Sequence, residues 1–258
     1  MKRWTLVTGG AGYVGSVLVP LLLASGRNVR VLDSLLHGSV PSLLGSWSDR
    51  QFEFVRGDVR DEEALRAALA DAKEVVHLAA VVGDPACARD PDEANAVNFE
   101  ATKCVLDGAE ASGVERFLFA STCSNYGNRD VLVNGSVVVY GEQFWRPYVH
   151  VYDAARAFAT VLDAPTESVA GEVYNVGSSA ENYRKLDIVE LLRERVPTTK
   201  VEFVQKDEDP RDYRVSFDKF EQVTGFHVSR GVADGIDEVA RLLKSGLLED
   251  PFAAAYRN

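Results

Sequence analysis

The feature that most restricts how this chain folds is a glycine-rich turn near its N-terminus. Glycines stand at positions 9, 12 and 15, directly after an apolar run over 4–8 and at the start of a helical pattern over 14–25. In such a strand–turn–helix unit the first glycine permits a tight turn, the second lets the backbone approach a pyrophosphate, and the third lets helix and strand pack closely. The residues expected to line this dinucleotide site are Gly9, Gly12, Tyr13, Val14 and Gly15.

Short apolar runs alternate with helical patterns through the first half of the chain. The predicted strands cover 4–8, 28–32, 52–56, 74–78 and 116–121, and the predicted helices cover 14–25, 61–70 and 91–112. Strands that alternate with helices pair in parallel through right-handed crossovers. The predicted fold class is therefore α/β, a Rossmann-type doubly wound parallel sheet. The 258 residues suit one such domain with a smaller C-terminal lobe.

The alternation becomes irregular after Tyr126. Strands are predicted over 136–140 and 172–176, and helices over 151–162, 185–195 and 232–243. No repeat, low-complexity tract or Gly/Ser linker separates the two parts of the sequence. We therefore expect residues 1–127 to form the cofactor-binding domain, and residues 128–258 to complete the fold and form a substrate-binding lobe.

An acidic residue ends the second predicted strand, at the position that selects the cofactor. Asp33 stands 18 residues after Gly15 and is followed by Ser34. A carboxylate there accepts hydrogen bonds from the adenosine ribose and repels the 2′-phosphate of NADP, so the predicted cofactor is NAD. Either of the nearby Arg27 and Arg30 would change this preference if its side chain turned toward the site. The alternative is that Asp33 is an ordinary turn residue.

Two further strand ends are predicted at the same edge of the sheet. Asp58 and Val59 follow the third strand, and Leu78, Ala79 and Ala80 follow the fourth. Ligands of open α/β sheets bind outside the carboxyl ends of the strands, so these residues are expected to line the cofactor. The Asp58 carboxylate can accept a hydrogen bond from the adenine amino group. The alternative for each residue is an ordinary strand end or helix cap.

Charge and cysteine content narrow the classes of partner. The 28 Lys and Arg residues against 39 Asp and Glu residues give a net charge of −11, which repels nucleic-acid phosphates. No nucleic-acid partner is predicted, and a phosphorylated small molecule requires a local group of arginines. Cysteines at 87, 104 and 123 fit neither a disulfide framework nor a zinc cluster, and no metal site is predicted. The absence of signal-peptide and membrane-spanning patterns predicts a cytoplasmic location with no membrane partner.

Several ordered motifs resemble those of the extended short-chain dehydrogenases/reductases. They are TGGAGYVGS at 8–16, GDVRD at 57–61, HLAA at 77–80, Asn98 with Thr102, and STCSNYG at 121–127. The segments WRPYVHVYDAARA at 145–157, EVYNVGS at 172–178 and DPRDYRVSFDKFEQVTGF at 209–226 are similar to the nucleotide-sugar epimerase and dehydratase branch. The resemblance covers nearly the whole chain. It implies a retained NAD that takes a hydride from a sugar carbon and returns it to the other face or to another carbon.

The resemblance also implies roles for residues beside the reacting carbon. Thr122 would hydrogen-bond the sugar oxygen and help its deprotonation. The 4,6-dehydratases of the family carry Asp-Glu directly after that threonine, whereas this chain has Cys123 and Ser124. Dehydration is therefore disfavoured, and epimerisation or ketone reduction is left. Asn98 would lie near the nicotinamide, and its alternative is a helix-interior residue bonded to the backbone.

A nucleotide-diphosphate sugar is the substrate class that the resemblance implies. Arg146 and Arg211 match the family arginines that hold the diphosphate, a task that suits a planar guanidinium. They would supply the local positive charge that the acidic chain otherwise lacks, and Asn134 would also contact the substrate. Relatives commonly dimerise through two helices, one of which corresponds to 91–112. A homodimer is therefore expected only if the second helix exists.

The chain departs from the family pattern at the residues that move the proton. The family carries Tyr-x-x-x-Lys, in which the tyrosine transfers the proton and the lysine lowers the tyrosine pKa. No tyrosine of this chain has a lysine four residues later, and Tyr152 is followed there by Arg156. The sequence passes from SNYG at 124–127 directly to NRDVLVN at 128–134, where family members carry several tens more residues.

Two explanations of this gap remain open. Either the protein has lost its catalytic helix, or segments of a longer chain are missing from the sequence. We favour the second, because deletion of a central helix and strand would expose the sheet and leave one edge unpaired. The predicted function is then an NAD-dependent nucleotide-sugar epimerase acting at C4, with a 4-ketosugar reductase as the alternative. Under the first explanation, the chain is a catalytically inert protein that binds NAD or a nucleotide sugar.

Overall fold

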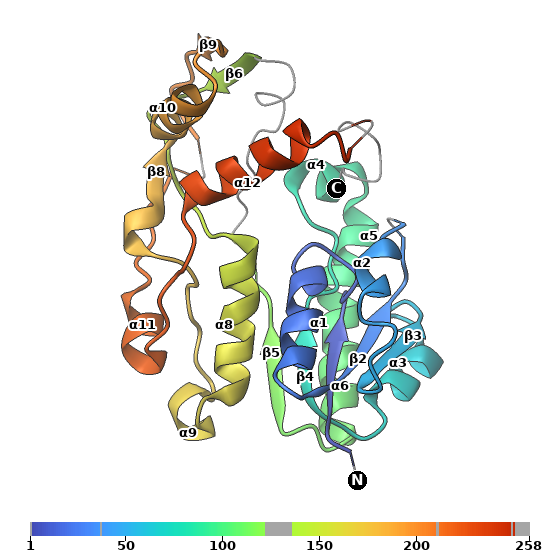
Figure 1. Cartoon of the computed structure of the whole chain (residues 1–258). Helices are drawn as coiled ribbons and strands as arrows, with labels where there is room; N and C mark the ends of the chain where they lie inside the picture. The colour runs from blue at the N-terminus through green and yellow to red at the C-terminus, as the bar shows by residue number, and fades with distance from the viewer. Residues whose placement is uncertain (1, 37, 122–135, 210–211, 249, 251–258) are drawn as a thin grey trace. The chain divides into compact units, whose positions relative to one another are not determined.

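The computed structural model of the chain describes residues 2–36, 38–121, 136–209, 212–248 and 250 (Figure 1). These residues belong to two compact units. The first contains the described residues up to 121 together with Phe158–Asp163, and the second contains the remainder. The boundary expected between 127 and 128 falls among residues outside the described ranges, so it stays a prediction.

A five-stranded parallel sheet is the centre of the first unit, with the strand order β3-β2-β1-β4-β5. Its strands are β1 (Trp4–Thr8), β2 (Asn28–Asp33), β3 (Phe52–Arg56), β4 (Ala72–His77) and β5 (Arg116–Phe119). From β1 the chain adds β2 and then β3 on one side of the sheet. It then crosses back and adds β4 and β5 on the other side of β1. The predicted doubly wound parallel sheet is confirmed. Leu78 and residues 120–121, which were expected in strands, lie beyond the strand ends.

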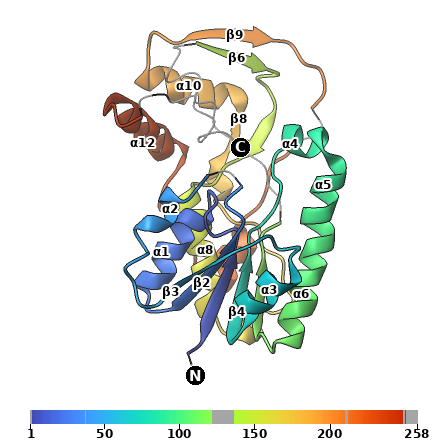
Figure 2. The same ribbon diagram turned by 90° about the vertical axis from the view of Figure 1, so that its right-hand side faces the viewer.

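Helices cover both faces of this sheet. They are α1 (Gly15–Ala24), α2 (Pro41–Leu44), α3 (Glu62–Leu69), α4 (Asp84–Arg89), α5 (Pro91–Asn95) and α6 (Ala101–Ala111), with a π-helical turn over Ala96–Glu100. Figure 2 shows α1 on one side of the sheet and α3 and α6 on the other. The helix predicted over 91–112 is present but interrupted by the π-helical turn, in which the Ala101 N–H bonds to the Ala96 carbonyl.

One hydrophobic core of the first unit lies between the sheet and the pair α3 and α6. Leu6, Leu32 and Val75 from the strands pack with Leu65 of α3 and Val105 of α6. Burial of such side chains stabilises the fold by about 1.5–3 kcal/mol each, which is why the strands read as apolar runs. Parallel pairing places the carboxyl ends of β1, β2 and β4 at one edge of the sheet. The predicted cofactor residues follow these ends.

The last turns of a long helix, α8 (Val151–Asp163), belong to the first unit. The Arg116 guanidinium on β5 donates to the Leu162 carbonyl at 2.9 Å, and Arg27 pairs with Asp163 at 2.6 Å. In the described part of the chain, β5 is the last strand of the sheet. These turns of α8 therefore lie beside a strand that has a neighbour only on its β4 side.

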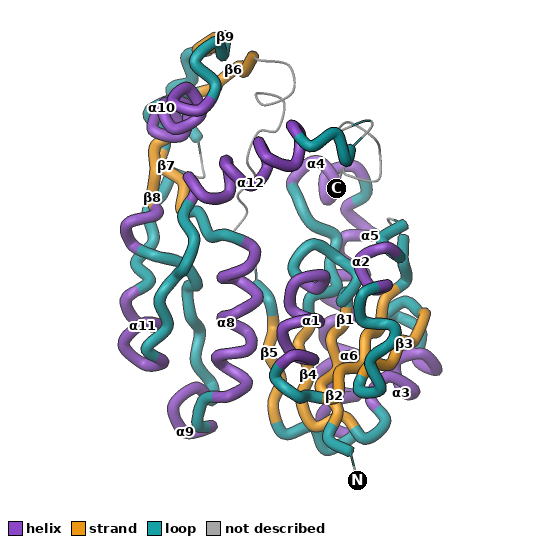
Figure 3. The backbone as a smooth tube through the Cα atoms, in the orientation of Figure 1, coloured by secondary structure: helices purple, strands orange, loops and turns teal. Residues whose placement is uncertain are grey.

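The second unit contains two small sheets and several helices (Figure 3). Its strands are β6 (Ser136–Tyr140), parallel to β9 (Lys200–Val204), and β7 (Trp145–Pro147), antiparallel to β8 (Asn182–Arg184). The helices besides α8 are α9 (Thr166–Val169), α10 (Lys185–Arg195), α11 (Asp218–Thr224), α12 (Val232–Lys244) and a 3-10 turn over Ser179–Glu181. Val137 and Val139 of β6 pack against Val189 and Leu192 of α10.

The prediction of a strand over 172–176 is wrong. This segment has no regular secondary structure, no strand pairs with it among the described residues, and Val173 is 80% exposed. Two hydrogen bonds hold the segment instead: the Lys219 ammonium donates to the Val173 backbone carbonyl at 3.0 Å, and the Asn175 side-chain amide donates to the backbone carbonyl of Ser216 at 3.1 Å. An apolar alternation therefore predicted a strand where tertiary contacts form a loop.

Candidate cofactor and substrate sites

The glycine-rich turn adopts the geometry that its sequence predicts. Gly9 has a φ of +68°, and a Cβ at this position would lie 2.8 Å from the Ala79 nitrogen. A Cβ at Gly15 would lie 2.5 Å from the Gly10 Cα, so α1 begins in direct contact with the turn. At Gly12 a Cβ would meet only the Gly9 carbonyl oxygen, at 3.2 Å, within a 4 Å radius. The backbone is therefore open on the side of Gly12, as a pyrophosphate site requires.

The Asp33 carboxylate fastens the end of β2 to this turn. Its Oδ2 accepts a hydrogen bond from the Ala11 N–H at 2.9 Å, and its Oδ1 accepts one from the Leu35 N–H at 2.8 Å. Leu35 has a φ of +58°, a left-handed conformation that is costly for a leucine. A carboxylate offers about four acceptor positions, so the two bonds leave capacity for the hydroxyls of a ribose. The ribose-binding role of Asp33 stays a prediction.

Neither nearby arginine turns toward Asp33. Arg30 is buried, bonds to Glu53 at 2.9 Å and to the Ala68 carbonyl at 2.9 Å, and lies over the Trp4 ring. It also precedes Asp33 by three positions in β2, and side chains at odd spacing point to opposite faces of a strand. Arg27 pairs with Glu74 and Asp163. The geometry thus favours NAD over NADP, since both arginines have carboxylate partners elsewhere.

Asp58 lies after β3 and pairs with Arg60. The Arg60 guanidinium and backbone N–H all donate to the Asp58 carboxylate, at 2.8–2.9 Å, and Arg60 also bonds to Glu93 at 2.7 Å. The hydrogen bond from Arg60 lowers the pKa of the Asp58 carboxyl, so this group is an anionic acceptor at neutral pH. Its neighbour Val59 is buried in the core that includes Leu65, and only its backbone can face a ligand.

The other residues predicted at the cofactor differ in exposure. Ser34 and Ala80 are exposed, and Tyr13 is 68% exposed. Val14 directly precedes α1, and Leu78 and Ala79 are half-buried. The Leu78 N–H donates to the Thr8 carbonyl at 3.1 Å, which continues the pairing of β4 with β1 into the loop. The roles of these residues in cofactor binding stay predictions.

Asn98 holds the loop that follows β4. Its Oδ1 accepts from the Val81 N–H at 2.7 Å, and its Nδ2 donates to the Val81 carbonyl at 2.8 Å. The residue lies on the π-helical turn, a distortion that often occurs at functional sites. Of the two readings of Asn98, the backbone-bonded one is observed. Contact with the nicotinamide stays a prediction.

In the second unit, Arg146 on β7 is buried and held by Asp209. One guanidinium nitrogen lies 2.6 Å from the Asp209 Oδ2, and another donates to the Trp145 carbonyl at 2.7 Å. Lys185, the first residue of α10, lies 3.2 Å from the same Asp209 oxygen. Sequence reasoning missed Asp209 and Lys185. The proximity of Asp209 to Arg211 in the DPRDYR segment was the available signal.

Several predicted site residues lie outside the described part of the chain. They are Thr122, Asn134 and Arg211, and the substituted positions Cys123 and Ser124 lie there as well. Within the described residues, no group of three or more His, Cys, Asp or Glu side chains could hold a metal ion. A search of the same residues for membrane-spanning helices found none of sufficient length and apolarity.

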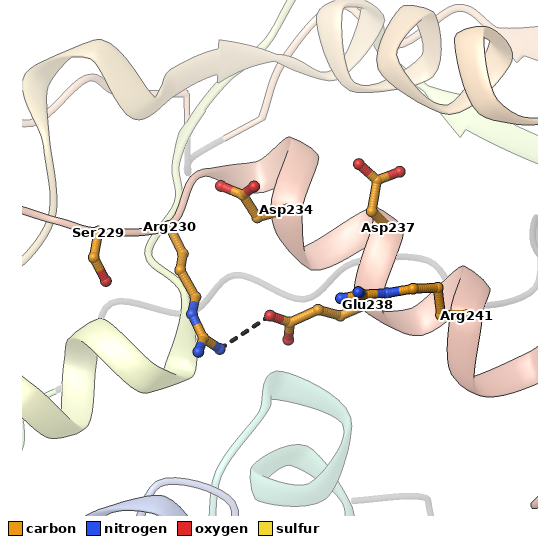
Figure 4. Close-up of a pocket in the computed structure, with 6 residues that line it drawn as sticks. All are labelled: Ser229, Arg230, Asp234, Asp237, Glu238 and Arg241. Atoms are coloured by element: carbon orange, nitrogen blue, oxygen red, sulfur yellow. Dashed lines mark hydrogen bonds and ion pairs between the residues drawn. The ribbon is translucent and has the colours of Figure 1, made fainter.

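A polar cavity of about 360 Å³ lies along α12 in the second unit (Figure 4). Figure 4 shows Arg230 bonded to Glu238, with Arg241, Asp234 and Asp237 around them. Asp237 also pairs with Arg195 at 2.7 Å, and Asp234 accepts from the Gly231 N–H at 2.8 Å. The carboxylates are therefore used within the protein, and none of the predicted site residues lines this cavity.

Three comparisons place the chain among known proteins. A model of the NAD dependent epimerase/dehydratase family matches residues 5–135 and 129–177. The UDP-glucose 4-epimerase of Mycolicibacterium smegmatis is 35% identical over 164 residues, 58% of this chain and 52% of the epimerase. A dTDP-glucose 4,6-dehydratase of Actinoplanes sp. is 29% identical over 311 positions, 90% of this chain and 95% of the dehydratase. The match with the epimerase thus spans about half of its length.

A solved structure has the same fold. The UDP-glucuronic acid 4-epimerase from Bacillus cereus, in complex with UDP-glucuronic acid and NAD, superposes with a TM-score of 0.81 at 18% identity. The superposition covers 94% of this chain and 99% of that one. At this identity the likeness supports the fold alone.

The alignments also bear on the missing Tyr-x-x-x-Lys segment. The alignment with the dehydratase has 311 positions although it uses 90% of a 258-residue chain, so tens of positions of the dehydratase have no counterpart here. The two segments matched by the family model overlap at 129–135. That overlap coincides with the place where the sequence lacks the expected residues.

Proposed function

Because this chain belongs to the NAD dependent epimerase/dehydratase family, we propose that it binds NAD at the glycine-rich turn and epimerises a nucleotide-diphosphate sugar at C4. The observation that carries the proposal is the Asp33 carboxylate, which joins the end of β2 to the turn at the Ala11 N–H. The carboxylate proposed to bind the ribose and the backbone proposed to bind the pyrophosphate then lie side by side at one edge of the sheet.

NAD, when bound, supplies a reversible acceptor for the hydride of a sugar carbon. The chain's own residues hold and orient the cofactor and the sugar. Asp33 offers acceptors to the adenosine ribose, and Asp58 offers them to the adenine amino group. The backbone after β4, held by Asn98, forms the wall beside the turn. Thr122 is proposed to hydrogen-bond the reacting sugar oxygen, by resemblance to the family.

Epimerisation is favoured over dehydration by two features. Cys123 and Ser124 stand where the 4,6-dehydratases of the family carry the Asp-Glu pair that eliminates water. The Mycolicibacterium relative, at 35% identity, is a UDP-glucose 4-epimerase. Recognition of the diphosphate is assigned to Arg146 and Arg211, because a guanidinium can bind two phosphate oxygens.

A second candidate function rests on the missing residues. Without a Tyr-x-x-x-Lys pair there is no evident group to move the proton of the sugar hydroxyl, and the chain would bind NAD or a nucleotide sugar without turnover. Removal of one catalytic residue typically costs several orders of magnitude in rate. This candidate requires the protein in the cell to lack the segment too.

The deciding experiment combines an intact mass with a turnover assay. A mass of the natively produced protein near 28.2 kDa would establish the deletion, whereas a mass several kDa higher would restore the segment. Conversion of UDP-glucose to UDP-galactose without added NADH supports epimerisation, and a requirement for NADH supports the reductase. Bound NAD with no hydride transfer supports the inert protein.

Variants of Thr122 sharpen the assay. Thr122→Val removes the hydroxyl at nearly unchanged volume and should lower kcat by about 10²-fold, within the range for general acid–base catalysis. Thr122→Ser keeps the hydroxyl and should retain most of the activity. Equal rates for the two variants would contradict the assigned role.

A further inference from the structure

A buried histidine ends β4, directly before the loop that forms one wall of the proposed cofactor site. His77 is in register with Thr8 of β1 and with Phe119 of β5, and it is 1% exposed. Its Nδ1 lies 2.7 Å from the Thr8 Oγ1, and its Nε2 lies 3.0 Å from the Thr102 Oγ1. One imidazole thus connects two strands with helix α6.

The partners of the two hydroxyls determine where the ring proton lies. The Thr102 hydroxyl donates its single proton to the Asn98 carbonyl at 2.9 Å, so toward His77 it can only accept. The proton between them therefore belongs to Nε2. A neutral imidazole has one N–H, so Nδ1 accepts from the Thr8 hydroxyl, whose free lone pairs accept the Ala79 N–H at 3.4 Å. With the proton on Nε2, each hydrogen bond of the imidazole and the two threonine hydroxyls has one donor and one acceptor.

The surroundings favour the neutral ring. Phe119 stacks on His77 with centroids 5.9 Å apart, and Phe117 lies at 6.1 Å. Burial away from water lowers the pKa of His77 to about 4. A second proton on Nδ1 would also leave the Thr8 hydroxyl proton without its acceptor. The described contacts of the ring contain no carboxylate that would offset a positive charge.

The network acts on the loop at two points. Thr8 accepts from the Ala79 N–H, and Asn98, whose carbonyl receives the Thr102 hydroxyl, binds both backbone groups of Val81. This loop presses against the glycine-rich turn, since a Cβ at Gly9 would lie 2.8 Å from the Ala79 nitrogen. A small displacement of Ala79 would therefore move the turn.

We infer that His77, as the neutral Nε2–H tautomer between Thr8 and Thr102, is a positioning residue that fixes residues 79–81 against the glycine-rich turn. The inference rests on the proposed binding of NAD at that turn. The ring touches neither cofactor nor substrate, and its contribution passes through the backbone of Ala79 and Val81. The alternative is that His77 is a core residue that stabilises the fold and has no effect on cofactor binding.

The test separates positioning from stability. His77→Phe keeps a planar ring but removes both hydrogen bonds, while Val75→Ala, on the same strand and fully buried, removes only apolar packing. Under conditions where both variants are folded, the Kd for NAD should rise about tenfold or more in His77→Phe and stay within about twofold in Val75→Ala. His77→Gln, which restores a donor toward Thr102, should recover part of the affinity.

Amide hydrogen exchange gives a readout at the loop itself. In His77→Phe the Ala79 and Val81 amides should exchange about tenfold faster or more relative to the Val76 amide of the strand, whereas Val75→Ala should change all three together. If His77→Phe fails to fold, Thr102→Val gives a milder test, because it removes the Nε2 partner at nearly unchanged volume. Equal NAD affinity and equal relative exchange in all variants would overturn the inference.

The tautomer is measured independently by ¹⁵N NMR of labelled histidines, with the His77 signal assigned by its loss in the variant. Protonated Nε2 and unprotonated Nδ1 from pH 5.5 to 8 is the expected result. An Nδ1–H tautomer, or titration near the ordinary histidine pKa, would overturn the inference. Failure of the proposed epimerase function has a different signature, namely wild-type protein that binds NAD but converts no sugar.

Discussion

The Asp209 carboxylate accepts a hydrogen bond from the Arg146 guanidinium at 2.6 Å, and the two side chains are 1% and 7% exposed. Lys185 lies 3.2 Å from the same carboxylate oxygen. These residues come from β7, α10 and a loop, so the ion pair joins separate segments of the second unit. A buried charge with its partner removed is strongly destabilising.

Asp209→Asn should therefore lower the free energy of unfolding by about 3 kcal/mol, since Arg146 loses its buried counter-charge. Urea denaturation at neutral pH measures this change. The matched control is Asp237→Asn, which breaks the more exposed pair with Arg195 and should cost less than about 1 kcal/mol. Equal losses of unfolding free energy in the two variants would show that the buried Arg146–Asp209 pair contributes no more to stability than the exposed pair. If Arg146 holds a diphosphate, Asp209→Asn should also bind UDP more weakly.

Two glycines with the same backbone conformation should respond differently to alanine. Gly9 and Gly113 have φ of +68° and +70°, so each Gly→Ala change pays about 1–2 kcal/mol for a left-handed alanine. Gly113 has open space around its Cβ, whereas a Cβ at Gly9 would clash with the backbone of Ala79. Gly9→Ala should lose more stability and weaken NAD binding, as thermal unfolding and NAD titration would measure. A Gly9→Ala variant that binds NAD normally would contradict the predicted role of the turn.

Asp33→Asn tests the basis of cofactor choice. The amide keeps one acceptor oxygen but loses the negative charge that repels a 2′-phosphate. Arg27 and Arg30 pair with Glu74 and Glu53, so the change at Asp33 is the only charge altered beside the turn. We expect the ratio of NAD to NADP affinity to fall about tenfold, measured as the two Kd values. Glu110→Gln, an exposed position on α6, removes one negative charge away from the turn and should leave the ratio unchanged. A preference for NAD that survives in Asp33→Asn would assign cofactor choice to other residues.

Asp153 should make stability depend on acid pH. Burial acts to raise the pKa of this carboxyl, but hydrogen bonds from Arg156, Ser229 and the Arg230 N–H outweigh it and lower the pKa below its usual value. A lowered pKa in the folded state contributes stability above the unfolded value of about 3.9, and this contribution is lost as pH falls toward the folded pKa. Between pH 6 and pH 3, urea unfolding should show a larger loss for wild type than for Asp153→Asn.

A control for this pH effect is Asp163→Asn, which removes an exposed carboxylate paired with Arg27. Its stability should follow that of wild type across the same pH range. Parallel stability curves for wild type and Asp153→Asn would contradict the assignment to Asp153.

The first unit was largely predictable from its sequence. Each strand near the site is a short apolar run, and the contacts of Gly15 with Gly10 and of Asp33 with Ala11 lie within one strand–turn–helix–strand unit. The close approach of Gly9 to Ala79, in contrast, depends on the pairing of β1 with β4. Local periodicity contains this information, because buried parallel strands and their crossover helices repeat the same two patterns. Asp33 ends β2 as expected, and its Oδ2 also accepts a hydrogen bond from the Ala11 N–H of the turn.

The second unit was less predictable, for a physical reason visible in two segments. The run over 172–176 alternates like a strand, yet its backbone bonds to side chains distant in sequence, such as Lys219. Arg146 is predicted from its motif to bind the diphosphate, but its observed partner Asp209 is 63 residues away in the sequence. Contacts between residues so far apart in the sequence produce no periodic pattern from which they could be predicted.

The sequence by itself determined the fold class, the glycine-rich turn and the acidic residue at the end of β2, because each depends on backbone conformation and spacing within a short segment. Only the tertiary structure decided which carboxylates the arginines pair with, that Asn98 binds the backbone of Val81, and that His77 links Thr8 to Thr102. Those outcomes follow from strand register and helix packing, which bring together polar groups that are far apart in the chain and must be satisfied once buried.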